Sequence, residues 1–182
     1  KDETGQPGGS HKVRHLFGTM LHLQAAEAVG APPVDGPLAI ASCGNAALAA
    51  AVIACAVQRE LVVFVPEWAD GNVTARLRDL GATLEVCRRV PEQVGDPCVV
   101  RFRDAVQRGA VPFSCQGPDN ALALDGSRTL AWEIVTGLGS LDQVFVQVGG
   151  GALASGLVQG LQEAVALGAM GRCPEIRAVQ AE

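Results

Sequence analysis

Apolar and polar positions alternate along the chain in blocks that predict short buried strands separated by helices. The run LAIAS over 38–42 is bounded by glycine and proline residues, as a buried parallel strand is, and an alanine-rich helix is predicted over 45–58 directly after it. The same alternation predicts strands over 61–66 and 83–87, with an amphipathic helix over 72–80 between them. A β-α-β-α-β succession of this kind predicts a parallel sheet with right-handed crossovers.

Helices and strands continue to alternate in the rest of the chain, without an internal repeat. The expected helices cover 11–29, 99–108, 129–138 and a segment from the glycine triplet at 149–151 to about Leu167, and the expected strands cover 111–115, 143–148 and 175–180. The pattern as a whole therefore predicts an α/β protein.

Composition supports a packed protein and argues against a nucleic-acid partner. Of the 182 residues 48% are hydrophobic, which suffices for an α/β core and excludes disorder. The net charge is -5, with acids and bases interspersed, so the chain lacks the basic stripe that a nucleic-acid backbone requires. Aromatic residues make up 4% and tyrosine is absent, which is unsuited to stacking on single-stranded bases. No nucleic-acid partner is expected.

Cysteine usage and the chain ends bear on the compartment. No two of the six cysteines form a Cys-x-x-Cys pair, and most lie in apolar runs, which favours buried thiols in a reducing compartment over disulfides or zinc ligands. The opening KDETGQ is no signal peptide, and the longest apolar stretch, 46–57, is too short to span a bilayer. We therefore expect a cytoplasmic protein without a membrane partner. The start without Met and the strand-like end RAVQAE suggest a fragment or a processed product.

The first segment with candidate chemistry is GGSHKVRHL. Gly8 and Gly9 permit unusual dihedral angles, and Ser10 is a good helix N-cap. Lys12 then falls in the first turn of a helix, where the helix dipole disfavours a cation. That position suits an amine that must form a Schiff base, although an ordinary surface lysine at a helix start also fits these residues.

The second segment is ASCGNAALA, in which a strand delivers four small or polar residues into a helix N-terminus. Free backbone N–H groups at such an end hold a carboxylate or a phosphate. Ser42 and Asn45 add neutral donors beside Cys43 and Gly44. An ordinary strand-to-helix turn with Asn45 as the N-cap is the alternative.

The third segment is QVGGGALASG, where a strand runs into three glycines and then a helix. Main-chain N–H groups cradle a phosphate in such an arrangement. Gly149, Gly151 and Ala154 also satisfy the dinucleotide pattern G-x-G-x-x-A, which leaves a nicotinamide-dependent oxidoreductase open. The acidic residue which that pattern requires would be Glu182, rather far along the chain.

In this order and spacing, the three segments resemble the motifs of fold-type-II pyridoxal-phosphate enzymes, the superfamily of tryptophan synthase β, threonine synthase and the serine/threonine dehydratases. KDETGQPGGSHKVR resembles their lysine segment, ASCGNAALAAA their asparagine loop and VGGGALASG their glycine-rich phosphate cup. DNALALDGSRTLAWEI is similar to the stretch that precedes the cup. The resemblance spans nearly the whole chain, and the cofactor it implies is pyridoxal 5′-phosphate.

The resemblance implies a role for each motif. Lys12 would hold the cofactor as a Schiff base and move the α-proton of the substrate, and Asn45 would hydrogen-bond the 3′-oxygen of the cofactor. The substrate carboxylate would be bound by Ser42, Cys43, Gly44 and Asn45. The cofactor phosphate would be bound by the N–H groups of Gly149, Gly150, Gly151, Ala152 and Leu153.

The chain departs from the superfamily pattern at several positions. His11 stands where relatives usually carry Phe, Gly9 where Thr is frequent, and Ala152 where the cup has its fourth glycine. Relatives also contact the pyridine nitrogen with a Ser, Thr or Cys far beyond the cup, and this chain ends before such a position.

Other conspicuous side chains receive structural interpretations. His11, His15 and His22 lie near one face of the predicted first helix, and a His-x-x-x-His pair can bind zinc. No third ligand is evident, so no metal site is expected. Arg14 is expected to form a structural ion pair, and Trp68 and Trp132 are expected to pack in the interior.

The resemblance further implies an α/β architecture of two open parallel-sheet, three-layer domains with the cofactor between them, like tryptophan synthase β. Residues 37–111 would form a small mobile subdomain with the asparagine loop, and residues 1–36 together with 112–182 would form part of the large cofactor-binding domain. A homodimer is expected from the resemblance alone.

The expected chemistry is elimination of a β-substituent from a small amino acid by an ammonia-lyase (dehydratase) acting on serine, threonine or a diamino acid. Threonine-synthase-like or cysteine-synthase-like replacement is the alternative within the superfamily. A nicotinamide-dependent oxidoreductase and a catalytically inactive homologue stay open outside it.

Overall fold

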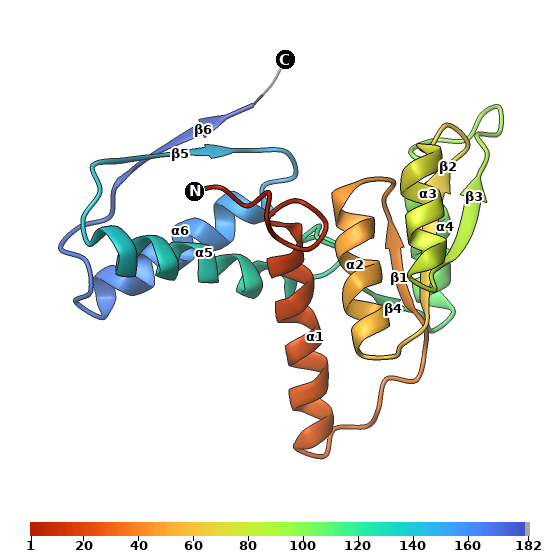
Figure 1. Ribbon diagram of the computed structural model, residues 1–182, viewed down its shortest axis with the longest axis horizontal. Coiled ribbons are helices and arrows are strands. Elements are labelled where there is room, and N and C mark those ends of the chain that lie inside the picture. Colours follow the sequence, from red (N-terminus) through yellow and green to blue (C-terminus); the bar gives the residue numbers. More distant parts are fainter. Residues whose placement is uncertain (181–182) are drawn as a thin grey trace.

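The computed structural model describes residues 1–180, over which helices and strands alternate (Figure 1). The helices are α1 (Lys12–Ala28), α2 (Asn45–Ala56), α3 (Gly71–Asp79), α4 (Pro97–Gln107), α5 (Ala123–Leu138) and α6 (Ala152–Ala166). The strands are β1 (Leu38–Ala41), β2 (Leu61–Pro66), β3 (Thr83–Cys87), β4 (Val111–Pro112), β5 (Gln143–Gln147) and β6 (Glu175–Val179).

The strands form two separate parallel sheets, which confirms the predicted α/β class. Four strands pair in the order β3-β2-β1-β4, and β5 pairs with β6 in the second sheet. In the larger sheet Leu38 of β1 lies opposite Leu61 of β2, and Val62 of β2 lies opposite Thr83 of β3. Figure 1 shows α1 standing between the two sheets, with α5, α6 and the smaller sheet on its other side.

Alternating residues of the larger sheet bury into two different cores, so the sheet is the middle of three layers. Leu38 and Ile40 of β1 pack in the core that includes α1 and α2. Ala39 and Phe64 point to the opposite face, where Phe102 of α4 covers them. A separate core joins α5, α6 and the smaller sheet through residues such as Leu157, Leu161 and Val146.

Helix α5 packs unusually close to its neighbours because small residues line it. A Cβ added at Gly126 would overlap the carbonyl oxygen of Arg14 in α1, and one added at Gly18 would lie 2.8 Å from the Cα of Gly126. On the other side, a Cβ added at Gly156 of α6 would overlap the hydroxyl of Ser127. These close approaches fix how α1, which carries Lys12, is placed against α6.

The structure corrects several details of the sequence-based prediction. The strand expected over 111–115 is paired only over β4, and the helix expected over 129–138 begins earlier, at Ala123. Trp68 and Trp132 do not pack in the interior: their side chains are exposed, Trp68 by 79%. The paired length of β4 and the burial of the two tryptophans could not be predicted from local pattern, because tertiary neighbours decide strand pairing and side-chain burial.

The thiols also divide differently from the expectation. Burial is confirmed for Cys87, Cys98 and Cys115, whereas Cys55 and Cys173 are exposed. Residue Cys55 lies near the end of α2, on the face turned to solvent. In the part of the chain that the structure describes, no helix is long and apolar enough to cross a membrane.

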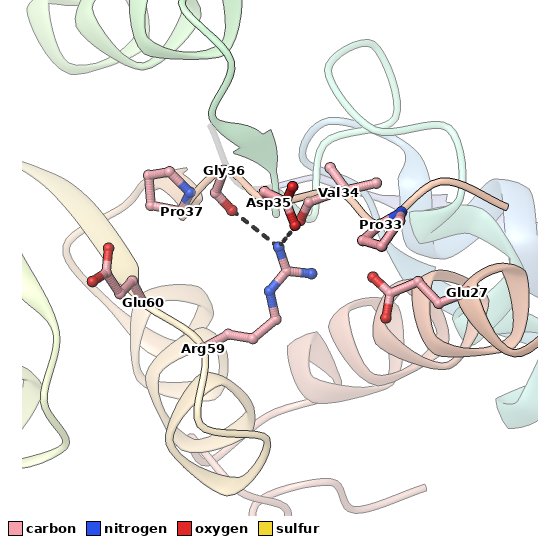
Figure 2. Close-up of a pocket in the computed structure, with 8 residues that line it drawn as sticks. All are labelled: Glu27, Pro33, Val34, Asp35, Gly36, Pro37, Arg59 and Glu60. Atoms are coloured by element: carbon pink, nitrogen blue, oxygen red, sulfur yellow. Dashed lines mark hydrogen bonds between the residues drawn. The ribbon is translucent and has the colours of Figure 1, made fainter.

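The connection from α1 to β1 is held by Arg59, which lies just beyond the end of α2. Arg59 donates to the carbonyl oxygens of Val34 at 2.5 Å and of Gly36 at 3.0 Å. A cavity of about 340 Å³ adjoins this arginine. Figure 2 shows its guanidinium with Glu27 and Glu60 on either side. Since the arginine is engaged with backbone carbonyls, we interpret its role as structural: it holds the connection between α1 and β1, and we do not assign a ligand to the cavity.

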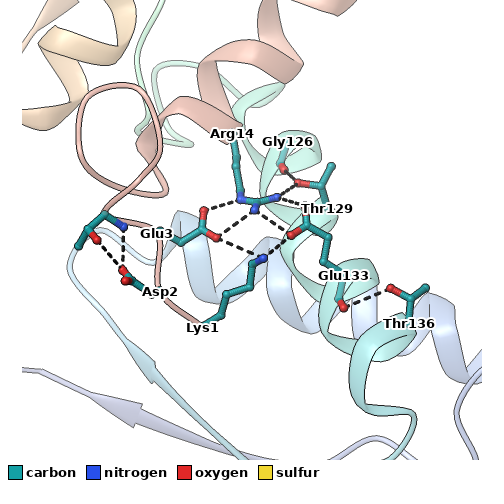
Figure 3. A network of polar contacts seen from close by, with 9 residues as sticks. Lys1, Asp2, Glu3, Arg14, Gly126, Thr129, Glu133 and Thr136 are labelled. Carbon is teal, nitrogen blue, oxygen red and sulfur yellow. Dashed lines mark hydrogen bonds and ion pairs between the residues drawn. The ribbon is translucent and has the colours of Figure 1, made fainter.

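Arg14 forms the predicted structural ion pair, and it joins the N-terminal segment to α5 (Figure 3). Its guanidinium, almost fully buried, bonds Glu3 at 2.6 Å and Glu133 at 2.7 Å. Lys1 approaches the same Glu133 carboxylate at 2.5 Å. Hydrogen bonds from Arg14 and then Lys1 lower the pKa of Glu133 to about 2. The network therefore fastens residues 1–4 and the start of α1 onto α5.

Replacing Glu133 with glutamine is expected to lower the free energy of unfolding by about 1 kcal/mol at pH 7, since the carboxylate is 46% exposed and solvent screens the pairs. The folded pKa lies below the ordinary value, so the stabilisation is complete above about pH 4.5 and is lost as the pH falls toward 2. Urea unfolding of both proteins at pH 7 and pH 3 measures it. Glu67→Gln, which removes a single exposed pair with Arg88, is the control and should change little. An equal loss in both variants would contradict the network's role.

Candidate functional site

A cavity of about 240 Å³ opens where the start of α1 meets the start of α6. Two of the three predicted motifs line it, although 135 residues or more separate them in the sequence. The lining residues are His11, Lys12, Cys115, Gln116, Gln147, Gly149, Gly150, Gly151, Ala152 and Leu153. The structure therefore brings the predicted lysine and the predicted glycine turn together.

Lys12 is the first residue of α1 and is half-buried at the edge of the cavity. Gly8 and Gly9 both adopt positive φ, at 79° and 72°, and so turn the chain into the helix. The predicted N-cap is shifted by one residue: His11 occupies it, while the Ser10 hydroxyl accepts the Lys12 N–H at 3.3 Å. The lysine thus projects from a tightly turned helix start.

The backbone of Lys12 is also held by Cys115, another residue that lines the cavity. The thiol of Cys115, which follows β4, donates to the carbonyl oxygen of Lys12 at 3.6 Å. Burial raises the pKa of this thiol to about 12, so it stays protonated and serves as a donor. Cys115 is therefore a positioning residue rather than a nucleophile.

The glycine turn presents a row of backbone donors to the cavity. Strand β5 runs into Gly149–Gly151, and Gly151, with φ 84°, caps α6. Within residues 1–180, the N–H groups from Gly149 to Ala154 donate to no acceptor, and the space beside each of the three glycines is open. Unpaired N–H groups at a helix start are the donor set that a phosphate dianion requires. The turn therefore fits a phosphate group.

Two histidines with lowered pKa values, His11 and His15, lie close to Lys12. Burial, and then the neighbouring Lys12 and His15, lower the pKa of His11 to about 4. Burial also lowers the pKa of His15, which is completely enclosed. Both imidazoles are consequently uncharged at neutral pH, so Lys12 is flanked by neutral polar rings rather than by further cations.

The asparagine loop lies next to this site but outside the cavity lining. Gly44, not Asn45, is the N-cap of α2, and Asn45 is the exposed first residue of the helix. Ser42 accepts the N–H of Gly44 through its hydroxyl at 3.4 Å. A Cβ on Gly8 would lie 2.9 Å from the Asn45 carbonyl oxygen, so the lysine segment packs directly on the start of α2. Cys43 is half-buried in the same turn.

Three cavity residues were not singled out from the sequence. Cys115 and Gln116 follow β4, and Gln147 ends β5. The carboxyl ends of parallel strands commonly line ligand sites, and that rule could have pointed to all three once the strands were predicted. Local pattern alone does not distinguish them from other polar residues after strands.

No metal site accompanies the cavity in the region that the structure describes, where no three His, Cys, Asp or Glu side chains gather to hold an ion. His22 instead contacts the Asp125 carboxylate at 3.0 Å, away from His11 and His15. Glu182, the acidic residue considered for a dinucleotide site, lies outside the described residues.

Comparison with known proteins assigns the chain to a family. A family described as "Pyridoxal-phosphate dependent enzyme" matches residues 1–182, which is the entire chain. Among relatives, an L-serine dehydratase/L-threonine deaminase of Mus musculus is 27% identical over 165 residues, covering 90% of this chain and 47% of the relative. A biosynthetic L-threonine dehydratase of Haemophilus influenzae is 27% identical over 157 residues, covering 86% of this chain and 28% of the relative.

A solved structure agrees with the same assignment. A fungal L-serine ammonia-lyase from Rhizomucor miehei superposes with a TM-score of 0.76 at 26% identity, covering 100% of this chain and 53% of that one. The chain thus spans about half or less of the length of these relatives. The cofactor of the family is pyridoxal 5′-phosphate. This chain belongs to the pyridoxal-phosphate-dependent enzyme family.

Proposed function

We propose that the chain carries the cofactor-binding part of an ammonia-lyase that eliminates the β-substituent of a small amino acid, namely serine, threonine or a diamino acid. The observation that carries the proposal is the single cavity shared by Lys12 and the unpaired N–H groups of the glycine turn. Relatives named serine dehydratase, threonine deaminase and threonine dehydratase support the choice of elimination.

Each side of the cavity has a distinct task in this proposal. When bound, the cofactor supplies an electron sink at the α-carbon of the substrate. The N–H groups of Gly149 to Leu153 would hold its phosphate, and the Lys12 amine would hold its other end and would move the α-proton of the substrate. The thiol of Cys115 holds the lysine backbone in place. The glycine turn and Lys12 would thus hold the cofactor at its two ends.

The asparagine loop completes the site in this proposal from the neighbouring sheet. Asn45 would hydrogen-bond the 3′-oxygen of the cofactor, and Ser42, Cys43 and Gly44 would bind the substrate carboxylate with the N-terminal N–H groups of α2. In this proposal residues 37–111 move toward Lys12 when substrate binds, and that movement excludes water. Mobility of this subdomain, like the homodimer, stays a prediction.

Product analysis tests the chemistry. The purified protein, loaded with pyridoxal phosphate, is incubated with L-serine, L-threonine or 2,3-diaminopropionate, and 2-oxo acid and ammonia are measured. Elimination from serine or threonine yields one ammonia per 2-oxo acid, whereas elimination from the diamino acid yields two. Formation of 2-oxo acid supports the proposal. Cofactor binding without 2-oxo acid, and a replacement product formed only when a thiol is added to serine or when an O-phospho amino acid is the substrate, would instead identify a replacement enzyme.

Replacing Gly150 with aspartate is expected to weaken binding of pyridoxal phosphate by roughly 10- to 100-fold, because a carboxylate would stand beside the bound phosphate. The space next to Gly150 is open, so the fold should be preserved. Gly171→Asp, at an exposed position that is equally open, is the matched control. Fluorescence titration measures both dissociation constants. Equal affinity of the two variants would place the phosphate elsewhere.

A further inference from the structure

His15 carries a buried nitrogen that has no partner. Its Nδ1 lies 2.7 Å from the carbonyl oxygen of Ala123, and since a carbonyl only accepts, Nδ1 must carry the proton. A neutral ring then leaves Nε2 as a bare acceptor, and among residues 1–180 nothing donates to it. A completely buried acceptor without a donor costs stability, so its retention calls for a physical reason.

His11, the N-cap of α1, places a second imidazole ring beside that of His15. The two ring centroids are 5.6 Å apart with their planes at 72°, which is an edge-on arrangement. His11 is 8% exposed and lines the cavity that holds Lys12 and the glycine turn. Of the two rings, His11 is the one that also lines the cavity.

We propose that His11 and His15 form a donor relay for the anion bound at the glycine turn. When the anion binds, His11 takes up a proton from solvent, donates one N–H to the anion and the other to Nε2 of His15. His15 in turn keeps its own N–H on the Ala123 carbonyl oxygen. The proposal rests on the proposed function only in placing an anion, the cofactor phosphate, at Gly149–Ala154.

The charges around His11 agree with proton uptake on binding. Without an anion, burial, Lys12 and His15 lower the pKa of His11 to about 4, and Arg14 acts in the same direction, while Glu3 opposes them. The remaining titratable group of the cavity, the Cys115 thiol, is neutral. An anion at the glycine turn stabilises the protonated ring and raises its pKa. Anion affinity should therefore increase as the pH falls from 8 toward 5.

Sulfate is the appropriate probe because it does not itself titrate near neutral pH. The chain contains three histidines, so a nitrogen-15 spectrum of the imidazole rings resolves each one, with His22→Gln providing one assignment. At pH 6.5 we expect His11 to change from neutral imidazole to imidazolium as sulfate or pyridoxal phosphate is added. His15 should stay protonated at Nδ1 throughout. Calorimetry in two buffers of different ionisation enthalpy should show uptake of up to one proton per sulfate.

Variants separate the relay from simple packing. His11→Phe, the residue type that relatives usually carry, should abolish proton uptake and weaken sulfate binding on the order of tenfold. His15→Phe should leave His11 neutral when sulfate is bound. His22→Phe, on the same helix but paired with Asp125, should match the wild type. If the His15 variant does not fold, the wild-type spectrum alone decides the question.

The outcomes for this inference and for the proposed function are separable. If pyridoxal phosphate binds through Lys12 but His11 stays neutral, the relay is wrong and the proposed function stands. If sulfate protonates His11 but pyridoxal phosphate does not bind, the relay stands as an anion site and the proposed function fails. If neither ligand binds, both are overturned.

Discussion

Replacing Lys12 with alanine is expected to abolish the visible absorbance of bound pyridoxal phosphate and to lower kcat/KM by about 10³-fold or more. An amine that both holds the cofactor and moves the substrate proton contributes to every later step, so its loss is not compensated by binding interactions that remain. Because Lys12 is half-buried at the edge of an open cavity, its truncation should leave the melting temperature of the cofactor-free protein nearly unchanged. Absorbance spectra, steady-state kinetics and thermal unfolding measure these three effects.

The chain offers an unusually clear control, because Lys1 is its only other lysine. The Lys1 side chain is 36% exposed, forms an ion pair with Glu133 and does not line the cavity that contains Lys12. Lys1→Ala should retain the absorbance band and the activity. Borohydride reduction followed by peptide mass spectrometry should find the cofactor on Lys12. A label on Lys1, or an unchanged band in Lys12→Ala, would refute the assignment.

Replacing Gly126 with alanine is expected to lower the free energy of unfolding by about 3 kcal/mol and the melting temperature by roughly 10 °C. The added methyl group would overlap the carbonyl oxygen of Arg14, and the nearby Cα of His15 leaves it no alternative space. Backbone of α1 cannot move away without also moving Lys12 and the Arg14 ion pairs. Cofactor affinity should therefore fall together with stability.

Gly137→Ala is the matched control for this prediction. Gly137 lies in the same helix α5, and nothing stands within 4 Å of the position that its Cβ would take. Alanine there should be neutral or stabilise the protein by up to about 1 kcal/mol, because alanine favours helix more than glycine does. Urea unfolding of both variants measures the difference. A Gly126→Ala protein as stable as the wild type would contradict the prediction, because it would show that α1 and α5 can move apart at little cost in free energy.

The elements and the cofactor class could be predicted from the sequence, because both depend on local information. Apolar runs of four to six residues between turn residues specify strands, and a glycine triplet before an amphipathic segment specifies a turn into a helix whose first N–H groups are unpaired. The lysine segment and the glycine turn were recognised in the same way, from short motifs in a fixed order. Element ends were predicted less well: α5 begins six residues earlier than expected, at Ala123 rather than Thr129.

Only the tertiary structure decided which of these residues share a cavity. It placed Lys12 beside Gly149–Leu153 and left Asn45 outside the lining. It also gave Gly126 its importance, since a missing side chain matters only where another backbone approaches, and that backbone lies more than a hundred residues away in sequence. Likewise the sequence shows His15 only as one of three histidines on a helix face, and its burial against Ala123 is what leaves one nitrogen without a donor. Local pattern determines what each segment can become, whereas burial and unpaired polar atoms depend on partners that only the folded chain brings together.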